Sequence, residues 1–217
     1  MNHSNMKKIV LINAHPSATS FNQALAQAYV DAVADNLHVE LIEIGKLNFE
    51  PNLKYGYEQR MPLEPDLQAA WEKIKVADHL VWIFPVWWGG LPAVSKGFID
   101  RVFLPRQAFS YVGKSNRIRG HLKHKSARII TTLDQAGWTY KWYFGEPSTR
   151  QLKDTTLKFC GVGRVKTHYL GPVRGSSLSQ RQVWLAYMQE LAQRDSRMLL
   201  NKSEQGFTER LRLYFSN

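Results

Sequence analysis

The chain has 217 residues, of which 44% are hydrophobic and 22% charged, values that suit one α/β domain and exclude a largely disordered chain. The single cysteine, Cys160, cannot form an internal disulfide or a thiolate metal cluster, so we expect a buried thiol, no metal site and a reducing, cytoplasmic setting. The net charge of +11, with basic residues concentrated from Lys114 to Arg128, favours anionic partners, but no nucleic-acid-binding motif accompanies it and we expect no nucleic acid.

Residues 7–14 are predicted to form a first strand, and their apolar run is too short for a signal peptide or a membrane span. The helix that follows has apolar positions at Phe21, Leu25 and Tyr29. Between them, residues 15–22 form a loop rich in hydroxyls and amides, ending where helix N–H groups favour a phosphate. Capping by Ser20 or Asn22 explains the same residues without a ligand. Neither Gly-x-Gly-x-x-Gly nor Gly-Lys-Ser/Thr is present here.

A second strand is predicted at residues 38–44, then a long connection at 45–63 and a helix opened by Pro65. Residues 80–84 form a continuous apolar run, typical of a parallel strand covered on both faces. After it come Trp87, Trp88 and two glycines, then a helix that Pro92 can open. The tryptophans fit either a core or the wall of a ligand site.

The remainder continues the alternation of strands and helices. Residues 104–125 are predicted as a connection, and a fourth strand at 127–132 runs into a polar and aromatic loop at 133–140. We expect a helix at 148–159, a fifth strand at 165–170 and a last helix from about residue 179. Residues 1–198 form one domain in this interpretation, and residues 199–217 a tail docked on the body or on a second subunit.

Five strands alternating with helices predict an α/β, doubly wound parallel sheet of the five-stranded flavodoxin type, with strand order 2-1-3-4-5 and helices on both faces. In this order the loops at 15–22, 85–90 and 132–140 meet at one edge. These loops would suit a flavin. The N-terminus of the first helix could bind its phosphate, Trp87 and Trp88 could lie beside its planar ring, with Trp138 a further candidate, and N–H groups near Gly89 could bond to the ring's carbonyl edge. The cofactor would supply the hydride chemistry, so no catalytic acid is required.

Several motifs strengthen this interpretation. They are Ala14-His15-Pro16, Ser20-Phe21-Asn22, Phe84-Pro85-Val86-Trp87-Trp88 with Pro92, Lys96-Gly97, Asp100-Arg101-Val102-Phe103 and Phe159-Cys160-Gly161. Together they resemble the NAD(P)H:quinone oxidoreductases of flavodoxin-like fold, a family that includes DT-diaphorase, the bacterial modulators of drug activity and ancillary subunits of potassium-efflux systems. The resemblance implies a homodimer with sites at the interface, bound FMN or FAD, and ping-pong transfer of hydride from NAD(P)H to quinones or similar acceptors.

The resemblance also implies roles by position. The residues expected around the flavin phosphate and ribityl chain are His15, Thr19, Ser20, Phe21 and Asn22. Those expected to line the isoalloxazine are Pro85, Val86, Trp87, Trp88 and Gly89. Those expected along its other edge are Thr131, Thr132, Leu133 and Asp134.

Two departures from the family pattern concern the ring. Many relatives have Gly-Gly where this chain has Leu133-Asp134. Tyr140 matches a tyrosine that handles protons in relatives, and is the one candidate for a catalytic residue, but no histidine accompanies it up to Cys160. Protons would then pass to water or to the flavin itself.

Two other functions compete with the oxidoreductase. The first is a regulatory flavoprotein subunit that contacts a membrane transporter through its basic surface. The second is a flavodoxin-type electron carrier, which the charge of +11 and the long aromatic loops disfavour.

Overall fold

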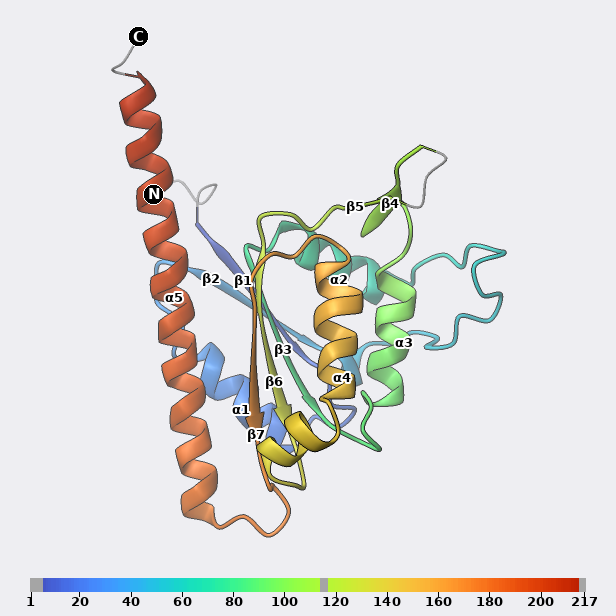
Figure 1. The fold of residues 1–217 in the computed structure, drawn as a ribbon, viewed down its shortest axis with the longest axis vertical. Coiled ribbons are helices and arrows are strands. Elements are labelled where there is room, and N and C mark those ends of the chain that lie inside the picture. The colour runs from blue at the N-terminus through green and yellow to red at the C-terminus, as the bar shows by residue number, and fades with distance from the viewer. Residues whose placement is uncertain (1–5, 114–116, 215–217) are drawn as a thin grey trace.

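The computed structural model describes residues 6–113 and 117–214, with side chains through Asn201. Its centre is a five-stranded parallel sheet (Figure 1). The strands stand in the order β2 (His38–Glu43), β1 (Lys8–Asn13), β3 (His79–Pro85), β6 (Ser126–Thr132) and β7 (Val165–Leu170). Since β6 and β7 are the fourth and fifth strands of this sheet, the predicted order 2-1-3-4-5 and the flavodoxin-like fold are confirmed.

Helices cover both faces of the sheet (Figure 1). One layer is α1 (Phe21–Val30) and α5 (Leu178–Tyr214); the other is α2 (Pro65–Val76), α3 (Ala93–Val102), the short α4 (Pro147–Arg150) and the π-helical η4 (Gln151–Lys158). Alternate residues of β1 pack against the two helix layers, because successive side chains of a strand point to opposite faces. Ile9 and Leu11 join the core under α1 and α5, and Val10 and Ile12 join the other core.

The connection predicted at residues 104–125 contains structure that the sequence interpretation missed. Strands β4 (Phe109–Tyr111) and β5 (Ile118–Gly120) pair antiparallel in a sheet of their own. Each has three residues, too few for an alternating pattern to show in the sequence. The ring of Phe109 packs on Phe159 at 4.8 Å, which anchors this hairpin to the end of η4. Lys114 lies outside the described residues.

Helical segments also differ from prediction in detail. The helix predicted at 148–159 is α4 continued by η4, and a short π-helical turn, η3 (Thr139–Tyr143), precedes it. A 3-10 turn, η2 (Ile44–Lys46), begins the connection predicted at 45–63. Helix α5 continues past residue 198 to Tyr214 and projects beyond the sheet (Figure 1), so most of the predicted tail extends the last helix. Residues 215–217 of that tail, and the side chains from residue 202 on, lie outside the described part.

The described helices include none with the length and apolar content needed to cross a membrane.

Candidate active site

The first predicted loop, between β1 and α1, is ordered by its own polar groups. The backbone N–H of Ser17 donates to His15 Nδ1 at 2.9 Å, which places the ring proton on Nε2. Burial lowers the pKa of His15, and the Ser17 carbonyl oxygen, 3.2 Å from Nδ1, raises the pKa by less because it can accept a hydrogen bond from the protonated ring. The imidazole is therefore neutral at pH 7 and offers one donor. Thr19 Oγ1 lies 3.1 Å from Ser17 Oγ, and Ser20 Oγ caps α1 by accepting from Gln23 N–H at 3.3 Å.

Asn22 joins the first loop to the end of β6. Its side chain is buried, and its Oδ1 accepts a hydrogen bond of 2.9 Å from Thr132 Oγ1. Its Nδ2 has no hydrogen-bond partner among the described residues. A buried donor without an acceptor costs free energy, so this amide suits a ligand that brings an acceptor. The neighbouring Phe21 packs instead on Trp184 of α5, with the ring centroids 6.0 Å apart.

The second loop is a tight turn directly after β3. Trp87 and Gly90 exchange backbone hydrogen bonds of 3.0 and 2.8 Å, and the two residues between them, Trp88 and Gly89, both have positive φ (53° and 73°). This is the conformation of a type I′ turn, which glycine adopts freely and tryptophan only under strain. The turn leaves the Trp88 side chain fully exposed, whereas the half-exposed Trp87 meets His15 edge to face at 5.6 Å.

The third loop follows β6 and is locked to the chain that follows β7. Leu133 N–H donates to Leu170 O at 2.9 Å, and Val173 N–H donates to Leu133 O at 2.7 Å. The Asp134 carboxylate accepts from Arg174 N–H at 3.0 Å and lies 3.7 Å from Arg174 Nε. Asp134 therefore places a solvent-exposed negative charge at this edge of the sheet, with a basic side chain next to it.

The second and third loops enclose a hollow of about 630 Å³ at the carboxyl end of the strands. Volumes of this order suit a cofactor or small ligand. Its lining residues are Val86, Trp88, Gly89, Leu133, Asp134, Gln135, Tyr140, Phe144 and Pro147. Five predicted cofactor-binding residues, and Tyr140, are thus brought together.

The other predicted site residues do not line this hollow. Pro85 is the last residue of β3, where it is buried beside Thr132, and the buried Thr131 bonds to His168 O at 3.3 Å. The first loop contacts residues that directly precede two lining residues: His15 meets Trp87, which precedes Trp88, and Asn22 bonds to Thr132, which precedes Leu133. Trp138, the further candidate for the ring, is exposed and does not line the hollow.

The side chain of Tyr140 is held by hydrogen bonds to the start of α4. Its side chain is buried, and its hydroxyl lies 2.6 Å from Ser148 Oγ and accepts from Thr149 N–H at 3.2 Å. The ring forms part of the wall while the hydroxyl ties η3 to α4.

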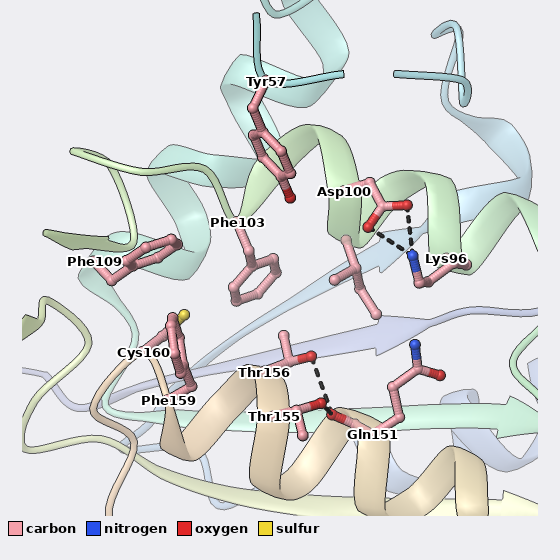
Figure 2. A pocket seen from close by; sticks show the side chains of 11 residues that line it. Tyr57, Lys96, Asp100, Phe103, Phe109, Gln151, Thr155, Thr156, Phe159 and Cys160 are labelled. Carbon is pink, nitrogen blue, oxygen red and sulfur yellow. Dashed lines mark hydrogen bonds and ion pairs between the residues drawn. The ribbon is translucent and has the colours of Figure 1, made fainter. Parts of the chain in front are cut away.

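A second hollow, of about 280 Å³, lies between α3 and η4 (Figure 2). It has an ion pair, Lys96 with Asp100 at 2.7 Å, opposite an aromatic side that includes Phe103 and Phe159. Cys160 borders it; the predicted buried cysteine is confirmed, and burial raises the pKa of its thiol to about 12. None of the predicted site residues lines this hollow. The hollow between the loops is therefore the better candidate for the active site.

Three wall residues were absent from the sequence prediction. Gln135, Phe144 and Pro147 line the hollow, and Pro147 lies next to Gly89, where an added Cβ would be 3.6 Å from its ring. Phe144 and Pro147 arrive there because η3 and α4 turn back over the sheet edge. The one signal for this turn is the Gly145-Glu146-Pro147 sequence, since glycine followed by a helix-opening proline marks a corner.

Comparison with known proteins agrees with the fold. The chain is 26% identical over 210 residues to an uncharacterized NAD(P)H oxidoreductase of Haemophilus influenzae, covering 94% of this chain and 100% of that protein. It is 29% identical to the ribosyldihydronicotinamide dehydrogenase [quinone] of Rattus norvegicus, covering 83% of this chain and 88% of that one. The solved structure of an FMN-dependent NADH-azoreductase from Bacillus anthracis, in complex with FMN, superposes with a TM-score of 0.63 at 21% identity, over 88% of this chain and all of that one. Residues 7–194 match the Flavodoxin_2 family, described as having a flavodoxin-like fold, and the chain belongs to that family.

Proposed function

We propose that this protein is a flavin-dependent NAD(P)H oxidoreductase that reduces quinones or similar acceptors. The observation that carries the proposal is the hollow at the carboxyl end of the strands, walled by Trp88 and Phe144. The buried amide of Asn22, whose Nδ2 has no acceptor among the described residues, bonds through Oδ1 to Thr132, the residue before Leu133 of that wall. The relatives named as NAD(P)H oxidoreductase and quinone dehydrogenase support it. In a sheet of this order, ligands bind at this edge.

The residues present fit a flavin. Asn22 Nδ2 is a buried donor in need of an acceptor, such as a ribityl or phosphate oxygen could supply. The neutral His15 and the N-terminus of α1 would favour the phosphate, and Trp88, Leu133 and Phe144 would border the ring. Because Trp87 N–H and Gly90 N–H already bond within the turn, the ring's carbonyl edge would take its hydrogen bonds from Trp88 or Gly89.

We propose FMN as the cofactor, with FAD as the alternative. The FMN complex of the azoreductase supports this choice. A bound flavin would supply hydride-transfer chemistry between NAD(P)H and the second substrate, and we expect a ping-pong exchange in one site. The chain's own part is to orient the ring and exclude water. Tyr140 then forms part of the pocket wall and links η3 to α4, since its hydroxyl is already hydrogen-bonded to Ser148 and Thr149.

Steady-state turnover tests this proposal. We expect the purified protein, loaded with FMN and without any partner, to oxidise NADH or NADPH in the presence of menadione, with parallel lines in a double-reciprocal plot as ping-pong kinetics require. A flavin-loaded preparation that does not turn over would contradict the oxidoreductase and favour the regulatory subunit of a transporter. The homodimer, the cytoplasmic location and the transporter contact remain predictions from the sequence.

A further inference from the structure

The corner formed by residues 144–147 carries backbone strain beside the proposed flavin pocket. Gly145 and Glu146 both have positive φ (71° and 48°), and glutamate, unlike glycine, adopts this conformation only at a cost. Phe144 and Pro147, on either side of this pair, line the pocket. Strained residues next to ligand sites persist only where the surrounding structure enforces them, so the corner must be held by specific contacts.

The contact that holds the side chain of Glu146 comes from β7. The hydroxyl of Tyr169 donates a hydrogen bond to the Glu146 carboxylate. Burial raises the pKa of Tyr169, and the neighbouring carboxylate raises it further, so the hydroxyl remains a donor at physiological pH. Hydrogen bonds to a charged acceptor are among the stronger ones in proteins.

The backbone of the corner is held by two further hydrogen bonds. Glu146 N–H donates to Tyr140 O at 3.0 Å, and Arg150 N–H donates to Glu146 O at 2.8 Å. The rings of Tyr140 and Tyr169 pack with their centroids 5.7 Å apart, so the two tyrosines support the corner from the same side. Of these contacts, the bond from Tyr169 is the one that a side-chain substitution can remove alone.

We infer that Glu146 is a positioning residue for the cofactor. Its hydrogen bond from Tyr169 holds the strained corner, so that Phe144 and Pro147 keep their places in the pocket wall that also contains Trp88 and Gly89. This inference rests on the proposed function, because the ring it positions is the flavin. Glu146 itself does not line the pocket, so its role is exerted through the wall rather than on the reacting atoms.

A double-mutant cycle on FMN affinity tests the brace. We expect Glu146→Ala and Tyr169→Phe each to weaken FMN binding about tenfold, and the double variant to be no weaker than either, because both remove one shared hydrogen bond. Glu146→Gln retains an acceptor oxygen and stays within about twofold of the wild type. Glu190→Ala, which removes an exposed glutamate of α5, is the matched control and leaves the affinity unchanged. Fluorescence quenching of FMN measures each dissociation constant.

Several outcomes would overturn the inference. Losses that add in the double variant, affinities unchanged from the wild type, or a Glu146→Gln variant as weak as Glu146→Ala each contradict the shared bond. Melting temperatures of the apoproteins separate this effect from general destabilisation, because a merely structural role would lower the melting temperature without weakening FMN binding by the folded protein.

Hydrogen exchange distinguishes a failure of the proposed function from a failure of the inference about Glu146. A wild-type protein that binds no flavin contradicts the proposed function, and the brace is then tested without ligand. We expect backbone amides of residues 139–150 to exchange about tenfold faster in Tyr169→Phe than in the wild type, since local opening becomes easier. Equal exchange rates in the two proteins would show that the bond does not hold the corner.

Discussion

Trp88 is fully exposed at positive φ, so its indole contributes almost nothing to packing of the core. We therefore expect Trp88→Ala to weaken FMN binding about tenfold, through lost aromatic contact, while the free energy of unfolding changes by less than about 0.5 kcal/mol. Titration with FMN and urea unfolding measure the two effects. Trp142→Ala is the control, because Trp142 is also exposed but does not line the pocket, and it should leave FMN binding unchanged. Unchanged FMN affinity with lost stability in Trp88→Ala would restore the core alternative.

The sequence placed Trp82 in a strand covered on both faces but could not assign Trp87 and Trp88 individually. Trp82 is fully buried within the strand, Trp87 is half exposed against His15, and Trp88 is fully exposed. Residue type is the same in all three cases, and what differs is the turn, where Trp88 takes a backbone conformation that tryptophan rarely adopts. The structure agrees with the prediction of a glycine-containing break after the strand. The direction of each indole depended on the φ value of Trp88, which the residue type does not reveal.

At the scale of elements, a buried polar network ties α5 to the sheet and to α1. Asp195 of α5 is buried and accepts from Arg128 Nε of β6 at 2.6 Å and from Tyr29 of α1 at 2.8 Å. Arg128 also bonds to His168 of β7, whose Nδ1 lies 2.8 Å from Tyr187 Oη. Removing one partner of such a buried pair leaves the other charge uncompensated, so the network constrains how α5 sits on the sheet.

The network predicts a pH dependence of stability. Burial, and then the positive charge of Arg128, lower the pKa of His168 from 6.5 to about 4 in the folded state. Between these values the unfolded chain binds a proton that the folded protein excludes, so stability rises with pH across this window and falls as pH decreases through it. Allowing for the partial exposure of the ring, the loss from pH 6.5 to pH 4 is about 2 kcal/mol.

Urea unfolding at a series of pH values measures this slope, with His168→Gln as the comparison. The variant lacks the titrating ring and should lose the His168 part of the slope between pH 6.5 and pH 4. Asp195, whose pKa is lowered chiefly by its hydrogen bond from Arg128 against the opposing effect of burial, keeps its charge through this window. An identical slope in the variant would show that another group titrates.

At the scale of the whole molecule, the sheet order and the helix layers were predictable because each depends on long, strongly patterned segments. The buried run around β3 and the helical spacing of α1 and α2 carry clear periodicity. The hairpin of β4 and β5 was missed because its strands are three residues long, and the extent of α5 because polar residues beyond 199 hide its continuation. The pocket wall at Phe144 and Pro147 was missed because it depends on a left-handed corner at Glu146.

The identity of the small molecule released when the purified protein is denatured tests the central claim most directly. The hollow between the loops after β3 and β6, together with the unpartnered buried amide of Asn22 in the first loop, predicts a flavin bound in stoichiometric amount. We expect mass spectrometry of the released material to show FMN, or FAD as the alternative, at about one molecule per chain. A colourless protein that releases no flavin and takes up neither FMN nor FAD when they are added would contradict the account.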